Sequence, residues 1–260
     1  MILRMSRYRG PFRATLRLSM IGLVATAGAA LAAASFYGTK YERQPTAAEL
    51  TALGRALFSE PALSGSGKMS CASCHVPSKA YGPPDGQSVQ PGGLNMTLQG
   101  MRAVPSLMYR AMTPSFSEHT YETEGDDSQD QGPTGGLTWD GRAQTMHEQA
   151  MVPLLSREEM ANTDAHQVVQ HLAASPSAKL FKQTFGAQIF SQPDLAWKAL
   201  LWSLEVFQES PSDFSPFSSK YDAFLRGKIQ LSEQEKRGWL AFNDADKGNC
   251  ASCHIRSENT

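Results

Sequence analysis

The sequence predicts a mainly α-helical protein built from two small domains of the same plan. Apolar residues recur at helical spacing along much of the 260-residue chain, and no segment shows a convincing alternating strand pattern. The order helix, loop, Cys-x-x-Cys-His occurs twice, ending first at His75 and again at His254. A chain of this length can bury two separate cores.

Helices are expected where a capping sequence precedes an apolar pattern. The segments 46–49 (Thr-Ala-Ala-Glu) and 232–235 (Ser-Glu-Gln-Glu) are capping boxes, and each opens a helical pattern that leads to a Cys-x-x-Cys-His run. Helical periodicity covers four segments between them: 143–152, 164–174, 176–185 and 194–207.

A Pro- and Ser-rich stretch, 210–217, predicts a linker between the two domains. We therefore expect a first domain at 46–209 and the beginning of a second at 215–260. Residues 117–136 are acidic and rich in glycine, which predicts a solvated surface insertion in the first domain. A calcium loop is the alternative interpretation, although the segment has no EF-hand pattern.

Residues 1–34 predict a secretory signal peptide. Five arginines without an acidic residue precede an apolar stretch of small residues, and Ala32-Ala33-Ala34 fits a cleavage site. The protein is therefore expected in the periplasm. An uncleaved anchor helix is the alternative, and only in that case would the chain be held at a membrane.

The charge of the chain after export limits its partners. Without those five arginines, 19 basic residues remain against 25 acidic ones, a net charge of about −6. This balance argues against nucleic acid as a partner, because binding to phosphates requires a basic surface. It permits a basic electron-donor protein, whose approach would be steered by charge.

All four cysteines lie in the two repeated runs. Cys71, Cys74 and His75 form the first run, and the second consists of Cys250, Cys253 and His254. In this spacing two thiols add to the two vinyl groups of one haem, and the histidine becomes the proximal iron ligand. The sequence therefore predicts two covalently bound haem c groups, with one histidine of each run as a metal ligand.

Two other uses of the cysteines are weaker. A structural zinc site usually brings its cysteine pairs together over a short loop, whereas these pairs lie far apart in the chain. Each pair could instead form a disulfide, since an exported protein meets an oxidising compartment. Neither alternative explains why a histidine follows both pairs at the same position.

Short stretches along the chain resemble the bacterial dihaem cytochrome c peroxidase family, which includes the MauG-type enzymes. The similarity runs from about residue 46 to the end and is most specific at Trp139-Asp-Gly-Arg142. The other similar stretches are Leu53–Phe58, Leu63–Ser64, Ser70–His75, Pro105–Leu107, Glu148–Ala150, Pro153, Glu159–Met160, Ser215–Phe217 and Tyr221–Gly227. The resemblance implies two cytochrome c-like haem domains, of which the first is peroxidatic and the second transfers electrons.

Three further site residues follow from the resemblance. Trp139, Gln149 and Glu159 are spaced ten residues apart, as in the family. The resemblance implies that Gln149 and Glu159 line the distal side of the first haem, where peroxide binds, and that Trp139 lies between the haems. A carboxylate can move the proton that peroxide cleavage requires, and an amide can hold the peroxide. Without the family, a helix-surface Gln–Glu pair and a buried core tryptophan are the alternatives.

The sequence departs from the family pattern in three places. Residues 92–104 contain no histidine to block the first iron, which by the resemblance implies an open site as in MauG-type enzymes. His119, in the acidic insertion, is either a surface histidine or a ligand that substitutes for the missing one. Ala103 replaces the family's calcium-binding asparagine, which puts an interdomain calcium in doubt. The chain ends six residues after His254, so we expect a truncated second domain without its other axial ligand.

The sequence thus predicts a peroxidase that reduces hydrogen peroxide at the first haem. Its electrons would come from a small c-type cytochrome or cupredoxin through the second haem. The alternatives are a MauG-type enzyme that oxidises residues of a protein substrate, and a dihaem electron carrier without a catalytic site.

Overall fold

A computed structural model describes residues 36–119, 132–252 and 254. The predicted signal peptide, most of the acidic insertion and Cys253 lie outside the described residues. The chain divides into two compact units, the first up to Ser210 and the second from Pro211 onward. Both units are mainly helical.

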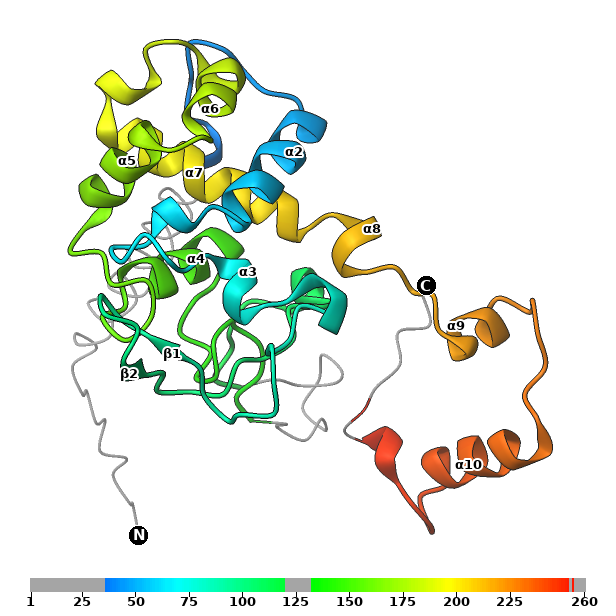
Figure 1. Cartoon of the computed structure of the whole chain (residues 1–260). Helices are drawn as coiled ribbons and strands as arrows, with labels where there is room; N and C mark the ends of the chain where they lie inside the picture. Colours follow the sequence, from blue (N-terminus) through cyan, green and yellow to red (C-terminus); the bar gives the residue numbers. More distant parts are fainter. Residues whose placement is uncertain (1–35, 120–131, 253, 255–260) are drawn as a thin grey trace, which may run out of the picture. The chain divides into compact units, whose positions relative to one another are not determined.

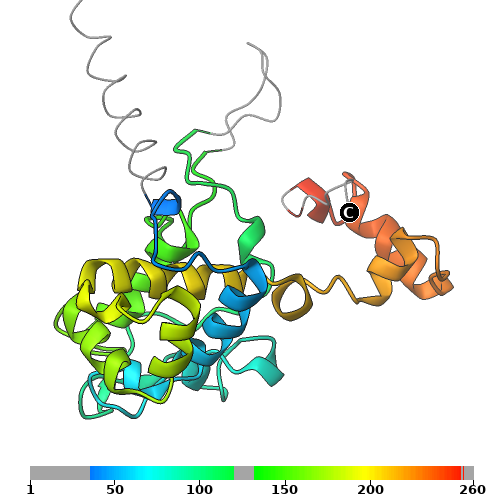
Figure 2. The ribbon, with the colours of Figure 1, turned by 90° about the horizontal axis from the view of Figure 1, so that it is seen from above.

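The first unit is organised around one central helix. Its helices are α2 (Ala47–Phe58), α3 (Cys71–Cys74), α4 (Met146–Leu155), α5 (Ala165–Ala174), α6 (Ala178–Phe185) and α7 (Pro193–Gln208). Helix α7 packs against α2, α4 and α5, as Figures 1 and 2 show from two directions. The four helical segments expected between the capping boxes correspond to α4, α5, α6 and α7.

Short elements connect these helices. Single 3₁₀ turns occupy Pro61–Leu63, Pro77–Lys79, Arg110–Met112 and Ile189–Ser191. The strands β1 (Pro91–Gly92) and β2 (Leu98–Gln99) pair antiparallel, with Pro91 opposite Gln99. At the edges of the acidic insertion, Ser117 and Thr134 pair with each other, so the described ends of the insertion lie side by side.

The predicted capping boxes are confirmed. Thr46 accepts a hydrogen bond from the amide of Glu49, whose carboxylate accepts one from the amide of Thr46, and α2 begins there. Ser232 and Glu235 make the same pair of bonds at the start of α10 (Glu233–Asn243). Local sequence therefore sets where both helices begin.

The second unit contains α8 (Pro211–Phe214), α9 (Lys220–Leu225), α10 and a 3₁₀ turn at Cys250–Ser252. Helix α8 is a difference from the sequence prediction, because it lies within the stretch expected to be a linker. A proline suits the first turn of a helix, where its missing amide hydrogen is not needed, and Asp213 follows in that turn. Within the residues that the structure describes, no helix is long and apolar enough to cross a membrane.

Helices α2 and α7 touch through a glycine. A Cβ atom at Gly54 would overlap the backbone carbonyl of Ser203 and the Cβ of Phe207. The leucines beside it in α2, Leu53 and Leu57, are fully buried against the same core. The close approach therefore requires a residue without a side chain at position 54.

We expect Gly54→Ala to lower the free energy of unfolding of the first unit by about 1–3 kcal/mol, because the helices must separate to admit a methyl group. Thermal unfolding followed by circular dichroism would measure the loss. Gly86→Ala is the matched control, since a Cβ there meets nothing within 4 Å. Equal stability of the two variants would contradict the expected helix contact.

Candidate functional site

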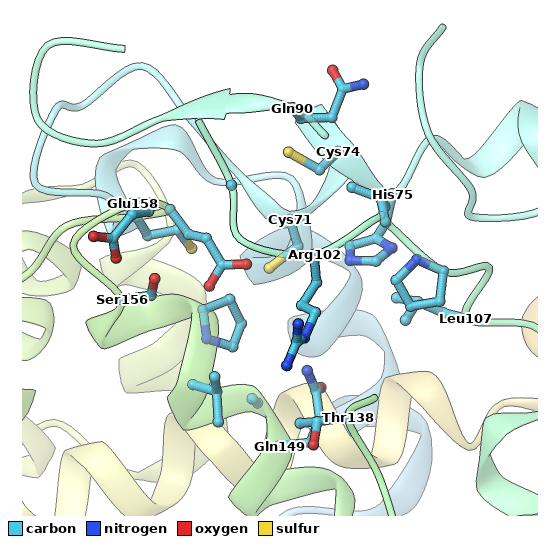
Figure 3. A pocket seen from close by; sticks show the side chains of 18 of the residues that line it. Cys71, Cys74, His75, Gln90, Arg102, Leu107, Thr138, Gln149, Ser156 and Glu158 are labelled. Atoms are coloured by element: carbon cyan, nitrogen blue, oxygen red, sulfur yellow. The ribbon is translucent and has the colours of Figure 1, made fainter. Parts of the chain in front are cut away.

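The first unit contains a cavity of about 230 Å³ that brings together residues distant in sequence. The first Cys-x-x-Cys-His run lines one part of it, and α4 with the loop that follows lines another (Figure 3). The segment 100–107, the loop 138–142 and two residues of α7, Leu204 and Gln208, also contribute to the lining.

The first run forms a single helical turn whose reactive side chains face the cavity. The amide of Ser70 donates to the hydroxyl of Ser73 at 3.0 Å and starts helix α3. Cys71 and Cys74, three residues apart, lie on one side of that turn, and both line the cavity with His75. Neither cysteine is in a disulfide, which contradicts the disulfide alternative for this pair.

The imidazole of His75 is oriented by the turn that follows it. Its Nδ1 lies 3.1 Å from the carbonyl oxygen of Tyr81, which is the geometry for Nδ1–H to donate, and the backbone of Pro105 also bonds the ring. Burial lowers the pKa of His75, so the neutral form that binds iron is favoured. Tyr81 is itself buried, with its ring edge-on to Phe58.

These residues fit a covalently attached haem better than a metal held by thiolates. Burial raises the pKa of the Cys71 thiol to about 12, and burial with the nearby Glu159 carboxylate raises that of Cys74. Thiolates are therefore disfavoured here, whereas neutral thioether sulfurs suit this setting. Across residues 36–119, 132–252 and 254, no cluster of three or more His, Cys, Asp or Glu is placed to hold a metal ion.

Gln149 and Glu159 reach the same cavity from two positions along one segment. Gln149 lies on α4, which is anchored by the buried side chains of Ala150 and Leu154, and Glu159 lies in the loop after that helix. Burial raises the pKa of Glu159; a hydrogen bond from Ser156 opposes the shift, and the neighbouring Glu158 adds to it. The cavity therefore holds a carboxyl group that takes up a proton more readily than an exposed one.

The loop that carries Glu159 is held by two glycines. The amide of Gly93 donates to the carbonyl oxygen of Glu159 at 2.8 Å. A Cβ at Gly92 would overlap the carbonyl oxygen of Glu158, so this close approach excludes any larger residue. The hairpin of β1 and β2 thus fixes the backbone of the acidic loop.

Trp139 lies at the cavity with its ring largely in solvent. Its exposed fraction is 63%, which contradicts the alternative of a buried core tryptophan. Its Nε1–H donates to the carbonyl oxygen of Ala103 at 2.8 Å and joins the two loops that line the cavity. Ala103, where the family has a calcium ligand, thus contributes its backbone oxygen to this contact.

Several polar residues of the cavity were not anticipated from the sequence, among them Arg102 and Ser156. The side chain of Arg102 projects into the cavity, and its guanidinium lies toward the amide of Gln149 (Figure 3). Ser156 supplies the hydroxyl that binds Glu159. In the sequence, Arg102 lies three residues before the family-like stretch Pro105–Leu107. No other pattern in the sequence indicates a role for it.

The histidines outside the two runs lie away from the cavity lining. His119 is exposed and does not line the cavity. His166 pairs with Asp194 at 3.0 Å, and His171 lies 3.1 Å from the amide oxygen of Asn162. His147 is buried on α4.

The second run makes the same backbone hydrogen bond as the first, although its turn is 3₁₀ rather than α-helical. The amide of His254 donates to the carbonyl oxygen of Cys250 at 2.9 Å, as the amide of His75 does to that of Cys71 at 2.8 Å. The ring of Phe242, from α10, lies 6.3 Å from that of His254. Cys253 lies outside the described residues, so the comparison rests on Cys250 and His254.

Comparison with known proteins gives consistent matches. The family model described as di-haem cytochrome c peroxidase matches residues 48–230. Methylamine utilization protein MauG of Paracoccus denitrificans is 34% identical over 84% of this chain and 54% of its own length. Cytochrome c peroxidase Ccp of Escherichia coli is 27% identical over 82% of this chain and 38% of its own.

Solved structures agree with these sequence matches. The diheme peroxidase BthA from Burkholderia thailandensis superposes with a TM-score of 0.69 at 32% identity, over 86% of this chain and 52% of that one. A MauG-like protein associated with microbial copper homeostasis gives a TM-score of 0.61 at 27% identity, over 83% of this chain and 56% of that one. The chain spans about half the length of the curated relatives it matches.

Proposed function

Since the chain belongs to the family of di-haem cytochrome c peroxidases and MauG, we propose that it is a di-haem oxidoreductase that reduces hydrogen peroxide in the cavity of its first unit. The observation that carries the proposal is that Gln149 and Glu159 line the same cavity as Cys71, Cys74 and His75. A covalently held haem with His75 as its ligand would supply the iron at which the O–O bond is reduced.

The side chains of the cavity account for binding and proton transfer. The amide of Gln149 donates a hydrogen bond to peroxide and does not compete for its proton. The carboxylate of Glu159 takes a proton from one peroxide oxygen and returns it to the other, which leaves as water. Over the whole reaction, two electrons and two protons convert one peroxide into two waters. Ser156 holds the carboxylate in place throughout.

Electrons are supplied from outside the cavity. We assign their delivery to a second haem held by Cys250, Cys253 and His254, which a small c-type cytochrome or cupredoxin reduces. Trp139 belongs to the route because its indole is both exposed and part of the cavity lining. Residues 1–34 would direct export, which places this chemistry in the periplasm. Calcium is not part of the proposal, because Ala103 offers no side-chain oxygen.

A MauG-type activity on a protein substrate is the second candidate. It is favoured by the absence of histidine from residues 92–104 and from the residues that line the cavity other than His75. An iron without a blocking ligand would react with peroxide in its oxidised form. In this candidate Trp139 would carry electrons from a partner protein's side chains.

Visible and EPR spectra of the oxidised holoprotein, before and after hydrogen peroxide, test the proposal. We expect a high-spin signal that changes on addition of peroxide without prior reduction, because no histidine other than His75 lines the cavity. Two low-spin haems that stay inert would contradict an open site and favour a dihaem electron carrier. Reduced donor cytochrome is then added together with peroxide. Oxidation of that cytochrome indicates peroxide turnover, whereas a MauG-type enzyme would oxidise a protein partner instead.

A further inference from the structure

A buried imidazole–carboxylate pair supports the face of α4 that carries His147. His147 and Glu205 are only 7% and 3% exposed, and Nδ1 of the imidazole lies 3.1 Å from both carboxylate oxygens. The pair joins α4 to α7. Burying a carboxylate costs several kcal/mol unless it is paired and hydrogen-bonded. The proposed peroxide chemistry uses neither residue, so the pair requires a separate explanation.

The segment that precedes α2 completes the pair. The hydroxyl of Tyr37 donates to Glu205 at 3.0 Å, and the ring of Phe36 stacks on the imidazole at 3.7 Å between centroids. Burial and the Glu205 carboxylate raise the pKa of Tyr37, so its hydroxyl remains a donor. Glu205 thus receives hydrogen bonds from two directions, as a buried carboxylate needs.

On its other side the imidazole reaches the first turn of α4. Nε2 of His147 lies 3.2 Å from the hydroxyl of Thr145, the residue that caps the helix. That hydroxyl accepts a hydrogen bond from the amide of Glu148 at 3.2 Å, and the carbonyl of Thr145 accepts one from the amide of Gln149 at 3.0 Å. The pair is therefore bonded to the cap that orders the backbone of Gln149.

Helix geometry explains why this support concerns Gln149. Two residues along a helix correspond to about 200° of rotation, so His147 faces α7 while Gln149 faces the cavity. The next turn gives less support, because Pro153 lies inside α4 and has no amide hydrogen to donate to the carbonyl of Gln149. The position of Gln149 thus depends on the first turn of the helix and its cap.

We propose that Glu205, acting through His147 and Thr145, is a positioning residue that holds Gln149 in the peroxide-binding cavity. The inference rests on the proposed function, in which Gln149 binds peroxide. Tyr37 and Phe36 take part in the same support, because they contact the outer side of the buried pair. A merely structural role for Glu205 would affect stability but not the part of the reaction that depends on Gln149.

A double-mutant cycle separates the two roles. The rate constant of the oxidised holoprotein with hydrogen peroxide is measured by stopped flow for Glu205→Gln, for Gln149→Ala and for the double variant. We expect Glu205→Gln to slow the reaction about tenfold in the native background, as a misplaced binding group does, and less than twofold when Gln149 is absent. Asp194→Asn, at the exposed start of α7, is the matched charge control and should leave the rate unchanged.

Two further measurements do not depend on turnover. In Glu205→Gln the amide hydrogens of residues 148 and 149 should exchange with solvent faster, while the visible and EPR spectra of the resting protein stay as they were. Tyr37→Phe removes only the outer hydroxyl and should slow the reaction in the same direction by a smaller factor. It serves as the test variant if Glu205→Gln fails to fold.

Three outcomes would overturn the inference. Equal slowing by Glu205→Gln with and without Gln149 would show that Glu205 acts independently of it. No slowing at all, with Gln149→Ala still slow, would remove Glu205 from the site and leave the proposed function intact. An unchanged rate in Gln149→Ala would instead overturn the proposed role of Gln149 itself, and the inference would fall with it.

Discussion

Replacing Glu159 by glutamine is expected to slow the reaction of the oxidised holoprotein with hydrogen peroxide by about 10²- to 10⁴-fold, the usual contribution of a positioned acid–base group. The amide has nearly the shape of the carboxylate and can still accept the hydroxyl of Ser156. It cannot take a proton from peroxide or return one to the leaving oxygen. Stopped-flow mixing with peroxide measures the loss directly.

The pH dependence of the same reaction identifies the group. Because burial raises the pKa of Glu159, its carboxylate takes up a proton at a higher pH than an exposed glutamate does. The rate constant should therefore fall on the acid side with a midpoint above the ordinary range of glutamate, and Glu159→Gln should abolish this limb. Glu158→Gln is the matched control and should retain the limb. An acid limb that survives in Glu159→Gln would assign the proton transfer to another group.

Replacing both Cys71 and Cys74 by alanine should remove one of two covalently attached haems. No thiol would then remain in the cavity to bond to the vinyl groups, although His75 would still be present. Mass spectrometry of the denatured holoprotein would show one haem instead of two, and the peroxide reaction should be lost with it. Such a loss would also rule out a carrier in which only the second haem reacts.

The corresponding change at Cys250 and Cys253 provides the reciprocal control. It should remove the other covalent haem and leave the one held by Cys71 and Cys74. If the protein without substitutions carries no covalent haem after denaturation, the assignment of both runs is contradicted. Two haems retained by the Cys71 and Cys74 variant would show that attachment occurs elsewhere in the chain.

Local patterns were sufficient for several elements of this fold. Helices α2 and α10 begin at their predicted capping boxes because a capping bond joins residues only three apart. The turn that brings Cys71 and Cys74 to one side also depends only on neighbouring residues. The segment 210–217 was less well predicted, since its prolines and serines indicate a break but one proline begins helix α8.

The sequence by itself determined the family, the mainly helical architecture and the two Cys-x-x-Cys-His runs, because each depends on residue types at fixed short spacing. Only the tertiary structure decided which side chains share the cavity. It exposed Trp139 and brought Arg102 toward Gln149. It also paired His147 with Glu205, two residues 58 positions apart that no sequence pattern had connected. Such contacts depend on how helices pack against one another, and spacing along a single segment does not contain that information.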